Sequence, residues 1–119
     1  MREMPIERGE LENPMKSTYS LEYYDSSWEL EYMQELEKPD NDVAKWTKNH
    51  GIRIPYFDED GKYRTYKPDF LVEKKDGTVE LHEMKGGHLL QNPITKRKAD
   101  AAREWCRVRK MNLKLLSKF

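Results

Sequence analysis

The sequence predicts an α/β domain in which a mixed central β-sheet is flanked by α-helices, and three observations support this prediction. Helical and extended patterns follow one another in the order helix, about three strands, helix, strand. The 3 Trp, 7 Tyr and 3 Phe can build a core, although 37% of the residues are charged and only 36% are hydrophobic. The length of 119 residues is that of one domain.

Composition excludes several classes of protein. The single cysteine, Cys106, leaves no partner for an internal disulfide, and with three histidines it cannot assemble a zinc finger. No run approaches the ~18 apolar residues of a membrane span, so the sequence predicts a cytoplasmic protein with no membrane partner. Residues 1–17 show no sustained periodicity, and we expect an N-terminal arm before a folded domain over residues 18–119.

The net charge of zero hides an asymmetry along the chain. Residues 1–60 contain 7 Lys and Arg against 15 Asp and Glu, whereas residues 61–119 contain 15 against 7. If the halves form separate surfaces, the second half presents a basic face to a polyanion such as DNA. The alternative is that the two halves neutralise each other through salt bridges, and charge alone leaves both possibilities open.

The first predicted helix covers residues 27–37, where helix-forming residues are frequent. Ser26 and Glu29 have the spacing of a capping box, and Pro39 limits the helix at its C-terminal end. Positions 29, 32, 33 and 36 share one helix face, so Glu29 leads a stripe that is otherwise apolar. The alternative for Glu29 is a purely capping role.

Extended segments and turn signals follow this helix. The segments predicted as extended are residues 52–57, 62–66, 69–73 and 78–85. Residues 58–61 and 74–77 both contain Asp-Gly and read as turns, the second of them as a tight hairpin. A second helix is expected from a cap at Thr95 to about residue 109, followed by a short strand over residues 112–116.

Acidic residues converge at one end of the predicted hairpin. Glu83 and Lys85 share a strand face, because side chains alternate along a strand. Antiparallel pairing about the tight turn brings Asp69 toward Glu83, and Glu29 adds a third acid from the first helix. Neighbouring carboxylates are ligands for Mg²⁺, and a nearby lysine can orient or deprotonate an attacking water, so the set suits phosphodiester hydrolysis.

Each of these residues also has an ordinary interpretation. Asp69 beside a proline is typical of a turn, and Glu83 with Lys85 could form an exposed ion pair worth less than ~1 kcal/mol. All three within one hairpin, on a strand face that begins with Val79 and Leu81, favour the catalytic interpretation.

The same residues resemble a known signature. Pro68-Asp69 followed by Glu83-Met84-Lys85 is similar to the motif of the PD-(D/E)xK nuclease superfamily, with Glu29 in the place of its first-helix acid. The segments YDSSWELEYM, IRIPY, DGKYRTYKPDFLVE and KADAAREWC resemble two branches, the TnsA-type transposon-end endonucleases and the head-completion nucleases of tailed phages. The likeness covers about residues 19–116.

This resemblance implies a restriction-endonuclease-like core and Mg²⁺- or Mn²⁺-dependent DNA cleavage. Asp69 and Glu83 would bind the metal together with the backbone carbonyl of Met84. Glu29 would act through a water or a second ion, and Lys85 would position the attacking water. The substrate stays open between phage DNA ends, a transposon end and a four-way junction. The alternative functions are a Holliday-junction resolvase and a non-catalytic DNA- or capsid-binding module.

Basic side chains outside this set are expected to contact DNA. They are Arg64, Lys67, His88, Lys96, Arg97 and Lys98. Residues 96–98 fall in the first turn of the helix capped at Thr95, where the macrodipole disfavours cations unless a phosphate is bound. A domain this small covers little DNA, so we expect a homodimer, with phage-head or transposition-complex proteins as possible further partners.

Overall fold

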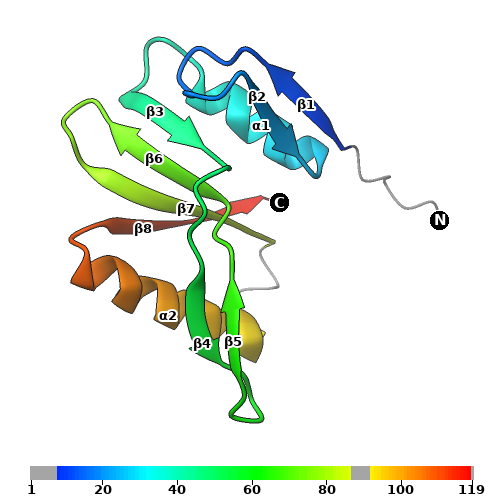
Figure 1. The fold of residues 1–119 in the computed structure, drawn as a ribbon, viewed down its shortest axis with the longest axis vertical. Coiled ribbons are helices and arrows are strands. Elements are labelled where there is room, and N and C mark those ends of the chain that lie inside the picture. The colour runs from blue at the N-terminus through cyan, green and yellow to red at the C-terminus, as the bar shows by residue number, and fades with distance from the viewer. Residues whose placement is uncertain (1–7, 87–91, 119) are drawn as a thin grey trace.

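The computed structural model describes residues 8–86 and 92–118, and it confirms the predicted α/β fold. A mixed sheet with the strand order β3-β6-β7-β8 lies between two helices (Figure 1). Its strands are β3 (Val43–Thr47), β6 (Phe70–Lys74), β7 (Val79–Gly86) and β8 (Asn112–Lys118). The helices are α1 (Ser27–Leu36) and α2 (Pro93–Val108). Within the described residues, neither helix combines the length and apolar character that crossing a membrane requires.

The β6–β7 hairpin has the predicted antiparallel register, with Phe70 opposite His82. Its turn is built from local contacts, because the Asp76 carboxylate accepts a hydrogen bond from the Thr78 amide at 2.9 Å. Gly77 has a φ of +89°, which L-residues with a side chain rarely adopt. The parallel pairing of β7 with β8 then makes the sheet mixed.

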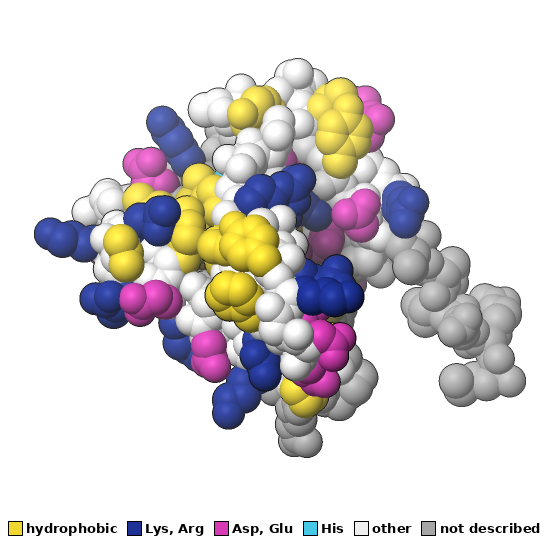
Figure 2. Space-filling model, turned by 60° about the horizontal axis from the view of Figure 1, so that its bottom comes forward, with side chains coloured by type: hydrophobic (Ala, Val, Ile, Leu, Met, Phe, Trp, Pro, Cys, Tyr) yellow, Lys and Arg dark blue, Asp and Glu magenta, His cyan; other side chains and the backbone are white. Residues whose placement is uncertain are grey.

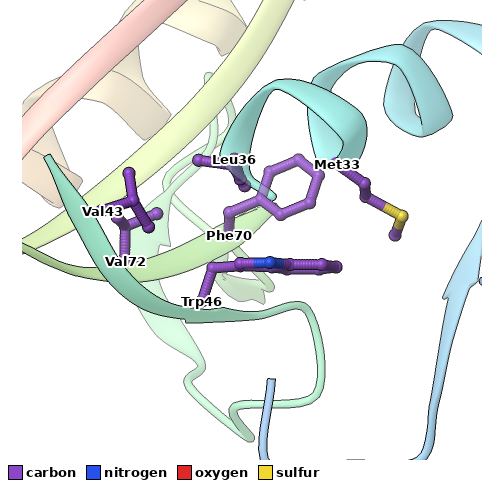
Figure 3. Close-up of a cluster of buried hydrophobic side chains, with 6 residues drawn as sticks. All are labelled: Met33, Leu36, Val43, Trp46, Phe70 and Val72. Atoms are coloured by element: carbon purple, nitrogen blue, oxygen red, sulfur yellow. The ribbon is translucent and has the colours of Figure 1, made fainter. Parts of the chain in front are cut away.

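Helix α1 covers one face of the sheet and forms a compact core with β3 and β6 (Figure 3). The buried members of this core are Met33, Leu36, Val43, Trp46, Phe70 and Val72. The rings of Trp46 and Phe70 meet edge-on, with centroids 6.1 Å apart. The predicted apolar stripe of the first helix is therefore confirmed, with Ser26 as its N-cap.

Helix α2 covers the opposite face, where Ala102 and Cys106 are buried against Leu81 of β7 and Ile54. Ile54 belongs to a second hairpin, β4 (Ile54–Phe57) and β5 (Tyr63–Tyr66), which extends past α2 (Figure 1). The two cores lie on opposite faces because Phe70 and Leu81 occupy alternating positions of the paired strands.

Helix α2 begins earlier than predicted. Asn92 is its N-cap instead of Thr95, and the Asn92 side chain accepts a hydrogen bond from the Ile94 amide at 2.9 Å. Pro93 takes the first helical position, where its missing N–H leaves no hydrogen bond unmade. Residues 96–98 consequently lie beyond the first turn. The helix macrodipole therefore gives no reason to expect a bound phosphate beside these three residues.

Residues 9–12 lie in the segment expected to be an arm, and they form a strand. This strand, β1 (Gly9–Glu12), pairs antiparallel with β2 (Leu21–Tyr24), and the hairpin lies beside α1 (Figure 1). Strand β3 was not predicted either. It is an edge strand of the central sheet, and its end leads directly into the candidate site.

Candidate active site

Two carboxylates lie side by side where β6 begins. Because Phe70 pairs with His82, Asp69 and Glu83 form the next opposite pair of the hairpin. The Asp69 amide donates a hydrogen bond to Oε1 of Glu83 at 3.2 Å, and the Met84 amide donates to Oδ2 of Asp69 at 2.8 Å. Backbone groups of the neighbouring strand therefore hold each carboxylate in place.

Glu83 lies on the α2 side of the sheet and is almost completely buried, with 3% of its surface exposed. Two neighbouring groups respond to its negative charge. Burial and then the charge of Glu83 raise the pKa of the Tyr66 hydroxyl, and burial is also the main cause of the raised pKa of the Cys106 thiol. A cation at this place would compensate the unfavourable burial of the Glu83 charge and reduce the repulsion between the paired acids.

Asp69 also lines a cavity of about 460 Å³ that is bounded by α1, the end of β3 and the segment before β6. Glu29 of α1 lines the same cavity, together with Lys48 and Lys67. The cavity thus brings Glu29 and Asp69 together from distant parts of the sequence. We call it the acidic cavity below.

Glu29 combines a capping position with a place in the acidic cavity. Its amide donates to the Ser26 hydroxyl at 3.2 Å, as the capping box predicts. Its carboxylate accepts a hydrogen bond from the Asp25 amide at 2.9 Å, one residue earlier than the standard box. The same oxygen, Oε1, forms an ion pair with the ammonium of Lys48. Capping therefore does not account for all of its contacts.

Lys48 was missed by the sequence analysis, as was the buried acid that holds its backbone. Glu22 of β2 is 1% exposed and accepts hydrogen bonds from the Lys48 amide at 3.0 Å and the Thr47 hydroxyl at 2.6 Å. The Ser17 hydroxyl completes this set at 2.5 Å. The residues come from β2, β3 and the segment between β1 and β2, so only the fold brings them together.

His50 was also missed, and it holds the segment that carries Asp69. Its Nδ1 accepts a hydrogen bond from the Ile52 amide at 3.0 Å, so Nε2 carries the proton and donates to the Pro68 carbonyl at 2.8 Å. Burial lowers the pKa of His50, which favours this neutral form. The loop after β3 is thereby fastened to the residue that precedes Asp69.

The predicted DNA-contact residues lie in several places. Lys67 is exposed at the acidic cavity, whereas Arg64 is paired with Asp58 at 2.6 Å. The Lys98 ammonium lies 5.6 Å from the ring centroids of both Tyr56 and Tyr66. On the face seen in Figure 2, basic and acidic side chains alternate around a group of hydrophobic ones.

The remaining predicted residues are Lys96, Arg97, Lys85 and His88. Lys96 and Arg97 are exposed on α2, and an Arg97 guanidinium nitrogen donates to the Phe57 carbonyl at 3.4 Å. The backbone of Lys85 continues β7 and pairs with Ser117 of β8. His88 lies outside the described residues.

The oxygen donors of the site suit a hard divalent cation. Among the residues that the structure describes, no three His, Cys, Asp or Glu side chains are already grouped as a metal site. Mg²⁺, however, commonly takes only one or two carboxylates and completes its shell with waters and phosphate oxygens. The Asp69–Glu83 pair meets that requirement, and Mn²⁺ accepts the same ligands.

A mixed sheet between two helices, with paired acids at the start of its central hairpin, defines an α/β domain of the restriction-endonuclease type. Residues 40–118 match the family model described as TnsA-like endonuclease N terminal. The match covers most of the chain, and the chain belongs to this family. The predicted resemblance to the transposon-end endonucleases is confirmed, and the domain is a PD-(D/E)xK-type nuclease with DNA as the implied substrate. No curated protein matches the sequence significantly.

The match has a consequence for the individual site residues. Asp69, Glu83 and Lys85 fall inside the matched range, whereas Glu29 precedes it. A role for Glu29 therefore depends on its place in the acidic cavity and not on the family match.

Proposed function

We propose that this domain hydrolyses phosphodiester bonds of DNA as an endonuclease that depends on Mg²⁺ or Mn²⁺. The observation that carries the proposal is the Asp69–Glu83 pair, which backbone hydrogen bonds hold side by side in a chain of an endonuclease family. We assign metal binding to these two carboxylates and to the Met84 carbonyl. We assign Glu29, across the acidic cavity, a contribution through a water or a second ion.

The bound cation and the site residues would then have separate roles in the reaction. The cation, when bound, supplies Lewis-acid polarisation of the scissile phosphate. Asp69 and Glu83 need little rearrangement to receive it, because their positions are already fixed by the hairpin. Lys85 follows Glu83 by two residues in β7, and we assign it the role of orienting or deprotonating the attacking water.

For DNA contacts we rank Lys67 first, because it lines the same cavity as Asp69. Lys96 and Arg97 are exposed on α2 and are retained as contacts to more distant phosphates. Arg64 must leave Asp58 before it can contact DNA, and Lys98 must leave two aromatic rings, so we expect both to contribute less.

The test is cleavage of supercoiled plasmid by the purified protein, with Mg²⁺ or Mn²⁺ and then with EDTA. Linear duplex, flap, single-stranded and four-way-junction DNA are tested in parallel to identify the substrate structure. We expect cleavage with either metal and none with EDTA. DNA that is bound but cut under no condition would contradict the proposal and favour the non-catalytic module.

A further inference from the structure

Lys48 has an unusual position for a lysine, because its charge lies at the acidic cavity and is largely shielded from water. Its side chain is 12% exposed and that of its ion-pair partner Glu29 is 16% exposed. The Asp25 carboxylate lies 3.7 Å from the same ammonium but is itself 72% exposed. Glu29 is therefore the main partner of Lys48.

The fold builds this position from several elements. The buried Glu22 holds the Lys48 amide, which fixes where β3 ends. The Lys48 ammonium lies 5.7 Å from the centroid of the Phe70 ring, at the edge of the α1 core. On the other side of the pair, the Asp25 amide holds the Glu29 carboxylate. The Lys48 backbone and the Glu29 carboxylate are thus held by contacts that do not depend on the ion pair.

The Glu29 carboxylate, which lines the acidic cavity together with Asp69, is already paired with the Lys48 ammonium. A divalent cation at Glu29 and the Lys48 ammonium carry like charges, so each disfavours the other at contact distance. Removing Lys48 from Glu29 without a replacement would leave a poorly hydrated carboxylate, which is unfavourable. The two cations are therefore expected to exchange at this oxygen.

We infer that Lys48 is the internal counter-cation of the candidate metal site, an inference that rests on the proposed function. In the metal-free protein its ammonium neutralises Glu29. When a divalent cation binds at the acidic cavity, the ammonium is released from Glu29 and becomes available to a phosphate of the DNA. Lys48 thereby offsets the charge of Glu29 before the metal binds and adds a phosphate contact afterwards.

The first test follows the reactivity of individual lysines in the unmodified full chain. The protein is treated briefly with acetic anhydride over a series of Mg²⁺ concentrations, and each lysine is quantified by mass spectrometry. We expect acetylation of Lys48 to rise along the Mg²⁺-binding curve. Lys45 of the preceding strand β3 is exposed, lies outside the acidic cavity and should not change. Acetylation of Lys48 that is indifferent to Mg²⁺ would overturn the inference.

The second test measures Mg²⁺ affinity by calorimetry in the absence of DNA. Lys48→Met keeps the aliphatic stem beside Phe70 and removes the competing charge. We expect Mg²⁺ to bind at least about tenfold more tightly to this variant, because one positive charge has left the site. Lys45→Met is the matched control and should bind as the wild type does. Equal or weaker Mg²⁺ binding by Lys48→Met overturns the inference.

The two proposals fail in different ways. A wild-type protein that neither binds Mg²⁺ nor cuts DNA overturns the proposed function and this inference together. If the wild-type protein binds Mg²⁺ and cuts DNA, either negative result (Lys48 acetylation that Mg²⁺ leaves unchanged, or Lys48→Met that binds Mg²⁺ no more tightly) overturns the inference alone. The acetylation test needs no variant, so it decides the matter even if Lys48→Met does not fold.

Discussion

Lys85 and the paired acids are expected to respond differently to substitution. If Lys85 orients or deprotonates the attacking water, Lys85→Ala should leave Mg²⁺ and DNA binding nearly unchanged. The single-turnover rate should fall on the order of 10²–10⁴-fold, as is typical when one such group is removed. Lys85→Arg should not restore it, because guanidinium is a poor proton acceptor. An unchanged rate with weaker DNA binding would make Lys85 a phosphate anchor instead.

Histidine burial predicts how stability depends on pH. His82 is 2% exposed, with Tyr32 Oη 2.5 Å from Nδ1 and Glu80 Oε1 2.8 Å from Nε2. Burial lowers the pKa of His82 despite the opposing effect of Glu80, and Lys74 and Lys114 act in the same direction as burial. The pKa of His50 is lowered mainly by burial as well.

The direction in which the free energy of unfolding changes with pH follows from proton uptake by the histidines. Below about pH 6.5, the ordinary pKa of histidine, His82 and His50 bind protons in the unfolded chain but remain neutral in the folded protein. The free energy of unfolding should therefore fall as the pH decreases from about 6.5 toward 5, by at most ~1.4 kcal/mol per pH unit for one histidine. Urea denaturation across this range measures the slope, and His82→Gln should reduce it. A stability that stays constant or rises on acidification would contradict this reasoning.

At the scale of elements, the start of α2 provides a direct test. Asn92→Ala should lower the free energy of unfolding by about 1 kcal/mol, because the Ile94 amide loses its capping acceptor. Thr95→Ala is the matched control and should change stability little, since Thr95 lies inside the helix. Urea denaturation measures both effects. A larger loss of stability in Thr95→Ala than in Asn92→Ala would indicate that Thr95 is the cap instead.

Elements that depend on local contacts could be predicted from the sequence, whereas those that depend on distant partners could not. The β6–β7 hairpin was predictable because Asp76 and Gly77 form its turn from neighbouring residues. Strand β3 was missed because a bulge between Val43 and Lys45 interrupts its alternation. Strand β1 has one apolar side chain, Leu11, and is defined by its pairing with β2.

The same distinction applies to the candidate site. Asp69 and Glu83 are brought together by one hairpin, so their adjacency followed from the position of the turn. Lys48, Glu22 and His50 reach the site through β2, β3 and the loop after β3, and no local pattern encodes those contacts. The start of α2 is different, because Asn92-Pro93 is a recognisable cap and first-turn pair that was passed over in favour of Thr95.

For the whole molecule, the question is whether the excess of positive charge in residues 61–119 is available to DNA. Part of it is neutralised across the two halves of the chain, since Arg64 pairs with Asp58 and Lys74 with Asp42. Other cations of the second half are paired within it, as Arg103 is with Asp100. Lys67, Lys96 and Arg97 are exposed, so their charges are available to phosphates.

DNA binding should therefore depend strongly on salt. The logarithm of the binding constant should fall linearly with the logarithm of salt concentration, by roughly 0.9 for each phosphate neutralised on duplex DNA. Lys67→Gln, at the acidic cavity, should flatten the slope by about one such unit. Arg103→Gln is the control and should leave the slope unchanged, because Arg103 is paired with Asp100. A slope near zero in the wild-type protein would mean that the basic excess is neutralised internally.

The measurement that tests the central claim most directly is Mg²⁺-dependent plasmid cleavage by Asp69→Asn and Glu83→Gln beside the wild type. In Asp69→Asn the side-chain amide oxygen can still accept the hydrogen bond from the Met84 amide, so the hairpin should keep its geometry while one metal-binding charge is lost. We expect each variant to remain folded, with an unfolding free energy equal to or above that of the wild type because repulsion between the acids is relieved. Cleavage should fall by at least about 10²-fold in each. Cleavage at the wild-type rate by either folded variant would show that Asp69 and Glu83 are not the catalytic metal ligands.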